Sequence, residues 1–531
     1  MEKKRLKTQV MIIGGGVTGT GLARDLALRG IQCVVVEKKD INAGASGGNH
    51  GLLHSGARYV ESDPAAACEC REEGELLKRL APQCIDDTGG LFVAVRGDDE
   101  NYVADFPLLC RQCEIGNREV DLSEVRELEP ELTEEVVAAY AVQDAAIDPF
   151  RLSLDNMAQA QQKGARLLRH TRVNAFDISR SKIRSTRLEN QRTGQVTIVE
   201  ADMVVNAAGA WAGKVASLAG SKINMLYSKG SLLVTQSRLT QRVVNRLRTA
   251  GDADILVPGG TVSMLGTTSV RVASPDHIFP EIEEVDYIID DAKAMLPVLE
   301  KTRYIRAYCG VRPLLGEEDS SDDRNVSRGY ALIDHGGEGV DNLISITGGK
   351  LTTYRLMAEK TADLVCRKLG ITSTCRTRTE PLPSTVDAKW TEPGLSPHLW
   401  VRRNDPKDLL LCECEMVPQS TVDEVVASIR KQDGPIGLTA IGLRSRVGKG
   451  PCQGTFCSQR VSAHLYDTGD FNGDMGVEEL RAFLTERWRG QHPLQWGTPL
   501  VQSGLLEAIH CGLFGLELDS GQGKADDGKP T

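Results

Sequence analysis

The chain has 531 residues, of which 26% are charged and 40% are hydrophobic, and its formal net charge is −10. This length predicts about three domains with cores of ordinary size. The acidic balance excludes a general nucleic-acid-binding protein, which needs a basic face, but it permits a small basic pocket for an anionic substrate.

The first residues, MEKKRLKTQVMIIGGG, combine basic residues with an apolar run, as a signal peptide does. The run stops at three glycines, however, and no small-residue cleavage site follows it. No stretch of about 18 apolar residues occurs that would span a bilayer. The sequence therefore predicts a cytoplasmic protein, whose 14 cysteines are mostly free thiols or metal ligands.

Residues 8–37 have the pattern of a dinucleotide-binding unit. The apolar run from Val10 to Ile13 predicts a buried parallel strand, a helical pattern follows and ends at Gly30, and a second strand closes at Glu37. The turn between the first strand and the helix carries G-x-G-x-x-G, made by Gly14, Gly16 and Gly19.

Each residue type in this unit has a physical function. Gly14 permits the tight turn, Gly16 lets the backbone approach a pyrophosphate, and Gly19 lets the helix meet the sheet. The N-terminus of the helix offers N–H groups and partial positive charge to the phosphates. Glu37 is placed to accept hydrogen bonds from the adenosine ribose. A glycine turn with a merely structural function is the alternative.

Three further segments favour FAD over NAD as the dinucleotide. The loop at 40–60 is rich in Gly, Ala and Ser, which can lie close against an extended cofactor. Residues 204–211 predict a buried strand that ends in small residues. Residues 344–355 predict a strand, a Gly–Gly turn and a helix start. One cofactor crossed by several distant segments is the simplest explanation.

The middle of the chain is less specific. Residues 145–170 predict a turn capped by Asp148, then an amphipathic helix and a strand, and residues 70–140 have helical charge patterns. This order is typical of amino-acid-oxidase-like flavoproteins. The predicted fold class is therefore α/β, with a Rossmann-like FAD-binding domain, an interleaved antiparallel substrate sheet and a small helical C-terminal domain.

Four cysteines near the C-terminus form two close pairs, Cys412-x-Cys414 and Cys452-x4-Cys457. Four thiolates can hold the two irons of a [2Fe–2S] cluster, and the glycines around the second pair allow backbone N–H groups to approach sulfide. Structural zinc is also held by four cysteines, although it usually has wider C-x₂₋₄-C spacing. A [2Fe–2S] cluster, zinc and no metal all remain open.

Several motifs resemble one family closely. They occur in order over roughly residues 8–500 and are similar to those of FAD-dependent glycerol-3-phosphate dehydrogenases, above all the A subunit of the anaerobic enzyme. The region of the four cysteines resembles a bacterioferritin-associated-ferredoxin-like [2Fe–2S] domain. The motifs are GGGVTGTGLARDLALRG, HSGARYV, KGSLL (229–233), GTTSVR (266–271), YCGVRPL (308–314) and TGGKLTTYRLMAE (347–359).

The resemblance implies oxidation of sn-glycerol 3-phosphate to dihydroxyacetone phosphate by hydride transfer to FAD. It also implies that electrons pass through the [2Fe–2S] centre and through further flavin and iron–sulfur subunits to membrane quinone, in anaerobic respiration. The chain would then lie on the cytoplasmic face of the inner membrane, attached peripherally through those subunits.

The resemblance also assigns site residues. It places Arg312 and Lys350 at the substrate, with Arg58 and Tyr59 nearby, and it makes His54 a candidate base. Arg suits bidentate binding of phosphate, and Lys supplies a point charge. Gly310 and Pro313 would frame Arg312 in a constrained turn. The remaining residues expected at the cofactor are Lys38, Ser46, His50, Gly209, Gly348, Gly349 and Thr352.

Some alternatives stay open. His54 could be a structural histidine bound to the cofactor, and Arg271 and Arg355 could form surface ion pairs. Aerobic relatives carry His where this chain has Leu232, which removes a possible acid/base group from that position. Two rival functions remain. The protein could be a FAD-dependent dehydrogenase or oxidase of another small 2-hydroxy or amino acid, or it could be a non-catalytic electron-transfer subunit.

The expected domain boundaries follow from these features. The Pro-rich, polar stretch at 386–406 predicts a linker, and the last residues, DSGQGKADDGKPT, predict a disordered tail. The FAD-dependent oxidoreductase domain is expected at 1–385 (nucleotide-binding segments about 8–60, 145–215 and 340–370, substrate segment about 220–335), the [2Fe–2S]-binding domain at 407–490, and a C-terminal extension at 491–531.

Overall fold

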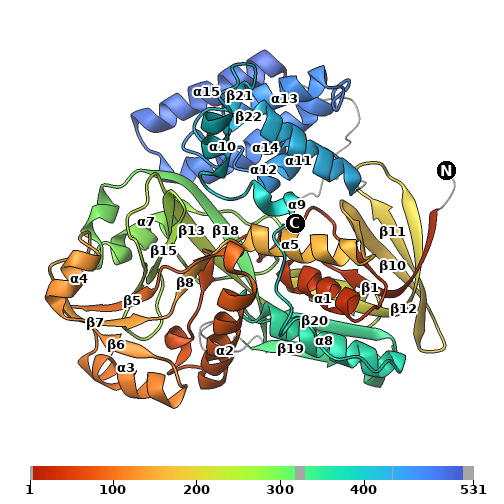
Figure 1. Ribbon diagram of the computed structural model, residues 1–531, viewed down its shortest axis with the longest axis horizontal. Coiled ribbons are helices and arrows are strands. Elements are labelled where there is room, and N and C mark those ends of the chain that lie inside the picture. The colour runs from red at the N-terminus through yellow and green to blue at the C-terminus, as the bar shows by residue number, and fades with distance from the viewer. Residues whose placement is uncertain (1–3, 317–328, 433, 518–531) are drawn as a thin grey trace, which may run out of the picture.

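The computed structural model describes residues 4–316, 329–432 and 434–517. Figure 1 shows two sheet-based units side by side, with a helical C-terminal module lying across the top of both. No helix in the described part of the chain is both long and apolar enough to cross a membrane. The predicted disordered tail lies outside the described residues.

The first unit is built on an eight-stranded, mainly parallel sheet. Its central strand β1 lies between β2 and β12 and is parallel to both. Val10 and Ile12 of β1 enter one hydrophobic core, while Met11 and Ile13 enter the core on the opposite face. A strand buried on both faces reads as a continuous apolar run, which is why the sequence predicted it. The strands are β1 (Lys4–Ile13), β2 (Cys33–Val36), β9 (Arg166–Leu168), β10 (Thr171–Ser179), β11 (Lys182–Asn190), β12 (Val196–Asn206), β19 (Tyr330–Asp334) and β20 (Leu343–Gly348).

The second sheet has nine strands and is mostly antiparallel. It includes three strands from the region in which the charge pattern predicted helices. The expectation of helices at 70–140 is right only for α2 (Pro64–Leu80), α3 (Glu100–Gln112) and α4 (Leu122–Leu128). Residues 90–95, GLFVAV, form a strand buried on both faces, whose partner β14 follows about 150 residues later in the chain. The strands are β5 (Gly90–Val95), β6 (Asn117–Glu119), β7 (Val136–Val142), β13 (Met225–Thr235), β14 (Val243–Arg246), β15 (Ile255–Gly259), β16 (Val262–Gly266), β17 (Val270–Val272) and β18 (Tyr304–Leu315).

Helices cover these sheets, and a small third sheet joins the two units. Asp148 caps α5 by accepting hydrogen bonds from the N–H groups of Phe150 and Arg151, as predicted. The third sheet comprises β3 (Leu52–Leu53), β4 (Ile85–Asp86) and β8 (Ala145–Ile147). The helices are α1 (Val17–Leu28), α2 (Pro64–Leu80), α3 (Glu100–Gln112), α4 (Leu122–Leu128), α5 (Pro149–Gln162), α6 (Ala212–Ser217), α7 (Ile282–Ala292) and α8 (Tyr354–Leu369).

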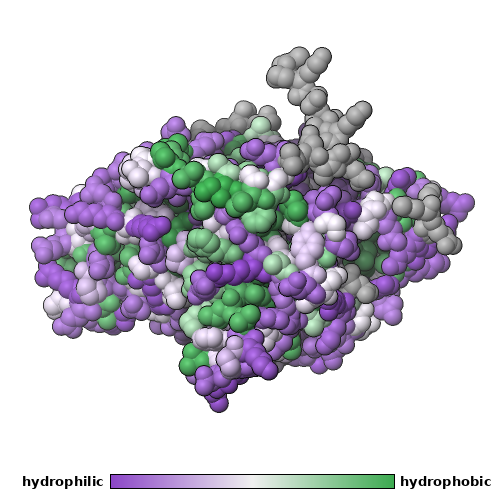
Figure 2. Space-filling view, turned by 90° about the horizontal axis from the view of Figure 1, so that it is seen from above, coloured by the Kyte–Doolittle hydropathy of each residue, from purple (hydrophilic) through white to green (hydrophobic). Residues whose placement is uncertain are grey.

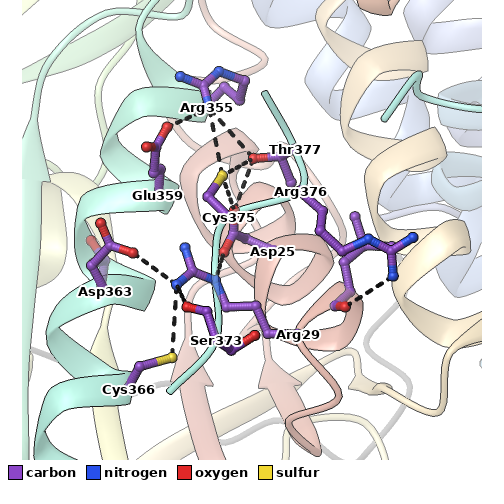
Figure 3. Close-up of polar contacts among 12 residues, drawn as sticks. Asp25, Arg29, Arg355, Glu359, Asp363, Cys366, Ser373, Cys375, Arg376 and Thr377 are labelled. Atoms are coloured by element: carbon purple, nitrogen blue, oxygen red, sulfur yellow. Dashed lines mark hydrogen bonds and ion pairs between the residues drawn. The ribbon is translucent and has the colours of Figure 1, made fainter. Parts of the chain in front are cut away.

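A buried polar network ties α1 to α8 and to the segment after α8 (Figure 3). Asp25 of α1 accepts hydrogen bonds from Arg29 and Thr377. Arg355 lies in the same network and forms ion pairs with Glu73, at 2.5 Å, and Glu359, at 2.6 Å. The alternative prediction, that Arg355 forms ion pairs, is therefore right, but these pairs are buried and not at the surface as predicted.

Replacing Arg355 with Met is expected to lower the stability of the protein by about 3–5 kcal/mol, because it leaves the buried carboxylate of Glu73 without its cation. Urea unfolding followed by tryptophan fluorescence measures the loss. The double variant Arg355→Met/Glu73→Leu should recover part of it. A loss below about 1 kcal/mol, typical of an exposed ion pair, would contradict the buried-pair account.

The C-terminal module is a helical bundle with one two-stranded sheet. Residues 386–406, predicted as a linker from their Pro and polar content, form two short helices, and Trp390 between them is buried in the core of the module. One aromatic side chain thus fixes a segment whose composition suggests a loop. The elements are α9 (Val386–Lys389), α10 (Leu395–Arg403), β21 (Leu410–Cys412), β22 (Val417–Pro418), α11 (Gln419–Lys431), α12 (Leu438–Arg444), α13 (Cys457–Asp467), α14 (Met475–Gln491) and α15 (Thr498–Phe514).

Buried contacts fasten this module to the first unit. Arg444 donates two hydrogen bonds to the carboxylate of Asp40, at 3.0 and 3.1 Å, and Arg169 donates another at 2.9 Å. Burial alone would raise the pKa of Asp40, but the two guanidinium groups hold it well below its usual range. The Nζ atom of Lys449 lies 5.4 Å from the ring centroid of Phe150. The module is therefore held against the loop that follows β2.

Candidate functional site

One cavity of about 1260 Å³ gathers most of the predicted site residues from segments that are far apart in the sequence. Its volume suits a large ligand such as a dinucleotide together with a small molecule. The predicted residues in its lining are Gly14, Gly16, Glu37, Lys38, Ser46, His50, His54, Arg58, Tyr59, Gly209, Arg312, Gly348, Gly349 and Lys350.

The glycine-rich turn forms the nucleotide end of this cavity. Gly14 has φ +115°, and a Cβ atom on Gly19 would lie 2.0 Å from the carbonyl oxygen of Gly14. Gly16 caps α1 without a side chain, so the first turn of the helix faces the cavity through its backbone. These features fit a pyrophosphate at the N-terminus of α1.

Gly19→Ala is expected to cost about 1–3 kcal/mol of stability through overpacking and to move the first turn of α1 away from the glycine-rich turn. The purified variant should therefore retain much less flavin per protein, which absorbance measures. Gly116→Ala is the matched control, because nothing lies within 4 Å of the added Cβ there. Full flavin content in Gly19→Ala would contradict this close-contact account.

Glu37 lies at the end of β2, beside the glycine-rich turn. Its carboxylate accepts hydrogen bonds from the N–H groups of Gly15, at 2.7 Å, and Lys39, at 2.8 Å. Burial raises the pKa of Glu37, and these two hydrogen bonds oppose the rise. Since a carboxylate oxygen can accept more than one hydrogen bond, Glu37 keeps capacity for ribose hydroxyls.

Lys38 and Ser46 extend the nucleotide end. The Nζ atom of Lys38 lies 3.5 Å from the ring centroid of Trp211, and burial lowers the pKa of this lysine to about 8. The hydroxyl of Ser46 accepts a hydrogen bond from the N–H of Val17, at 3.0 Å. Trp211 was not predicted as a site residue, although it ends the strand motif at 204–211 that pointed to the cofactor.

Strand β18 brings Arg312 into the cavity, at what we call its cation end, which Arg58 and Lys350 also line. The prediction that Gly310 and Pro313 frame Arg312 in a turn is wrong, because all three residues lie within a strand paired with β13. Gly310 instead permits close packing: a Cβ atom there would lie 2.3 Å from the carbonyl oxygen of Gly48. A Cβ atom on Gly230 would lie 2.5 Å from the guanidinium of Arg312. The two glycines make room for the loop and for the arginine.

Three cations converge at this end. Arg312 donates hydrogen bonds to the carbonyl oxygen of Thr268, at 3.0 Å, and to the hydroxyl of Thr267. Arg58 forms an ion pair with Asp254, at 3.0 Å. The Nζ atom of Lys350 lies 4.5 Å from the ring centroid of Tyr59. A cavity end with three cations suits an anionic ligand.

Two histidines, His50 and His54, line the cavity, and His54 lies beside Tyr59. The Nε2 atom of His54 lies 3.4 Å from the hydroxyl of Tyr59, and the rings of His54 and His50 are 6.1 Å apart. Leu232 also lines the cavity, so the position at which aerobic relatives carry His faces the same space. His54 and His50 thus offer imidazole groups to the cavity, whereas residue 232 offers no group that could accept a proton.

Four residues weighed in the sequence analysis lie outside the lining of the cavity. Gly19 packs α1 against the glycine-rich turn, as described above. Thr352 is buried, and its hydroxyl accepts a hydrogen bond from the N–H of His54, at 3.2 Å. Arg271 is exposed on β17, and Arg355 belongs to the network in Figure 3. Thr352 therefore contacts His54, which lines the cavity, without lining the cavity itself.

The four late cysteines come together in the C-terminal module. The Sγ atom of Cys414 lies 3.8 Å from that of Cys412 and 3.6 Å from that of Cys452, and Cys457 contacts both Cys412 and Cys452. These distances match sulfurs that share one tetrahedral metal with bonds of about 2.3 Å. As they stand, however, no three His, Cys, Asp or Glu side chains within the described ranges are arranged to hold a metal ion.

The backbone around these sulfurs offers hydrogen-bond donors to a metal–thiolate centre. The N–H groups of Glu415 and Gly448 point at the sulfur of Cys412, and those of Gly454 and Phe456 point at Cys452. A Cβ atom on Gly450 would lie 2.5 Å from the sulfur of Cys414. Backbone donors around cysteine sulfurs are one of the protein's means of setting the potential of an iron–sulfur centre.

Comparison with known proteins agrees with this geometry. The family model for FAD dependent oxidoreductases matches residues 9–364. Glycerol-3-phosphate dehydrogenase from Bacillus halodurans, whose X-ray structure contains FAD, superimposes with a TM-score of 0.63 at 22% identity over 92% of this chain and 96% of that one. The predicted α/β fold with a FAD-binding domain and a second sheet is therefore confirmed.

Two relatives match almost end to end. The A subunit of anaerobic glycerol-3-phosphate dehydrogenase from Escherichia coli (strain K12) is 40% identical over 532 residues, which cover 96% of this chain and 97% of that protein. The A1 subunit of the enzyme of the same name from Haloferax volcanii is 36% identical, with coverage of 97% and 92%. The chain therefore belongs to the FAD dependent oxidoreductases and, within them, to the family of anaerobic glycerol-3-phosphate dehydrogenase A subunits.

Proposed function

We propose that this protein oxidises sn-glycerol 3-phosphate to dihydroxyacetone phosphate. The observation that carries the proposal is a single cavity lined both by a dinucleotide-binding turn and by the cations Arg58, Arg312 and Lys350. The names of relatives that match nearly the whole chain support the same substrate. FAD, when bound, supplies the hydride acceptor for the carbon that carries the secondary hydroxyl.

The residues of the chain would bind and orient the substrate. Arg312 and Lys350 hold the phosphate, with Arg58 and Tyr59 beside them, because the phosphate carries most of the substrate's charge. The hydroxyl proton leaves as the hydride departs, and His54 is the candidate acceptor because it faces the cavity and touches Tyr59. The cations also favour the alkoxide that develops during transfer.

The four cysteines are proposed to hold a [2Fe–2S] cluster, which would take electrons from the flavin one at a time. Their module packs on the first unit through Lys449 and Phe150. Phe150 in turn lies 3.2 Å from the Cβ position of Gly47, in the loop that lines the cavity. This short chain of contacts supports electron exit from the flavin towards the module.

Further flavin and iron–sulfur subunits are proposed as the next carriers, leading to quinone in anaerobic respiration. Support comes from the name of the relatives, each of which is one lettered subunit of a larger enzyme. In this proposal the protein works in the cytoplasm and lies peripherally on the inner membrane through those further subunits.

An anaerobic titration of the purified protein with glycerol 3-phosphate tests the substrate. We expect the flavin absorbance to bleach with the substrate, and not with glycerol or inorganic phosphate. Bleaching only with a 2-hydroxy acid or an amino acid would redirect the assignment to those substrates. A protein that holds flavin but is bleached by none of these donors would instead be an electron-transfer subunit.

A further inference from the structure

Helix α15, near the end of the described chain, is hydrophobic on all sides and yet mostly exposed. Of its residues, all of which the structure describes, His510 alone is buried. Leu505 is 61% exposed, Val501 71% and Leu513 73%, and Trp496 just before the helix is 76% exposed. A helix that is hydrophobic all round is normally buried, so among the described residues this one lacks an element that covers its exposed face.

Helix α15 is joined through its buried side to α13, the helix that begins at Cys457. His510 stacks on Trp488 and contacts the side chain of Gln459, at 2.7 Å, close after Cys457 in the chain. Phe456, which precedes Cys457, is 56% exposed, and Cys414 is exposed as well. Figure 2 looks down on the C-terminal module and shows hydrophobic side chains gathered on this face.

We infer that this surface, made by Trp496, Leu500, Val501, Leu505, Ile509, Leu513 and Phe456, binds an apolar helix of a second protein that carries the electron acceptor. The inference rests on the proposed function, in which electrons leave at the four cysteines. A partner docked on α15 and Phe456 would sit beside Cys414, where those electrons leave. Exposed aromatic and aliphatic side chains of this kind form the central contacts of protein interfaces.

Other occupants fit the surface less well. An anionic membrane attracts helices that carry Lys and Arg, but α15 has no Lys or Arg, and its one acidic side chain, Glu507, pairs with His492. The residues after 517 lie outside the described part and read LDSGQGKADDGKPT, with one large apolar residue. A second copy docked here would cover Cys414 in both chains and block the exit.

The test uses the full-length protein with a photo-crosslinking amino acid in place of Leu505, expressed in its own cells. We expect one adduct with a protein of different sequence that carries a redox centre, and the crosslinked position should lie in an apolar helix of that protein. The same crosslinker in place of Val137, an exposed residue on β7, is the control and should give no such adduct.

The captured protein is then purified and its affinity measured. Leu505→Glu/Ile509→Glu should weaken binding by about tenfold or more, whereas Val137→Glu/Ile282→Glu, which changes equally exposed residues on other elements, should not. Bleaching of the flavin by glycerol 3-phosphate should stay unchanged in every variant, because none of these residues lines the cavity.

Three results would overturn the inference: an adduct with a second copy of this chain, adducts no stronger than those of the Val137 control, or flotation with phosphatidylglycerol vesicles that the Glu variants abolish. None of these three results contradicts the proposed oxidation of glycerol 3-phosphate. A wild-type protein whose flavin is not bleached by glycerol 3-phosphate would instead contradict the proposed function, so the two failures are distinguishable.

Discussion

Replacing Arg312 with Ala is expected to lower kcat/KM for glycerol 3-phosphate by about 10²- to 10³-fold, since each hydrogen bond to a charged group contributes about 1.5–3 kcal/mol. The loss should appear mainly in KM if the arginine only binds phosphate, and in kcat as well if it orients the reacting carbon. Steady-state reduction of a soluble dye by the purified, flavin-loaded protein measures both.

Arg271→Ala is the matched control for this prediction. Arg271 lies on β17, which pairs with the same strand β13 as β18 does, but its side chain is exposed and outside the cavity lining. Its loss should change kcat/KM by less than about threefold, as for an exposed charge. Arg312→Lys separates charge from geometry, because Lys restores the charge without the bidentate fork. A near-normal kcat/KM in Arg312→Ala would contradict the assignment of Arg312 to the phosphate site.

The contrast between Arg312 and Arg355 shows what the sequence could and could not establish. Both arginines occur in motifs of the family, and the motifs alone do not separate them. In the structure Arg312 faces the cavity, whereas Arg355 is buried against Glu73, 282 residues away in the chain. Partners so distant leave no trace in local composition.

Local patterns predicted the parts of the fold whose causes are local. The unit at 8–37 is fixed by apolar runs, glycines and a terminal acid within about 30 residues. The buried strand β5 was missed because its apolar run is short, and a run of four to eight apolar residues is ambiguous between strand and helix. The contact of Lys449 with Phe150 was missed for a different reason: no local pattern links residues so far apart in the chain, although both lie near features that the sequence did reveal.

The spacing and the family resemblance predicted that the four cysteines hold a [2Fe–2S] cluster, with zinc or no metal as the alternatives that the spacing left open. The structure brings the four sulfurs together without deciding between iron and zinc. Cys412→Ser addresses this point. We expect the variant to lose its iron together with the visible absorbance and the electron paramagnetic resonance signal of the reduced cluster, since Ser is a poor ligand for iron at this site. Metal analysis of the wild-type protein should show iron, and zinc in its place would correct the assignment.

The Cys412→Ser variant should separate two half-reactions: reduction of the flavin by substrate, and transfer of the electrons onward from the flavin. Reduction of the flavin by glycerol 3-phosphate should stay within about twofold of the wild type, because Cys412 does not line the cavity and lies in a different module. Transfer of electrons to the membrane fraction should fall by at least about tenfold, as expected when a redox centre is lost. Cys68→Ser, which changes a thiol on α2 far from the four cysteines in sequence, should affect neither step. Equal losses of both steps in Cys412→Ser would mean that the cysteines support the fold of the flavin site, and that electrons leave the flavin by another route.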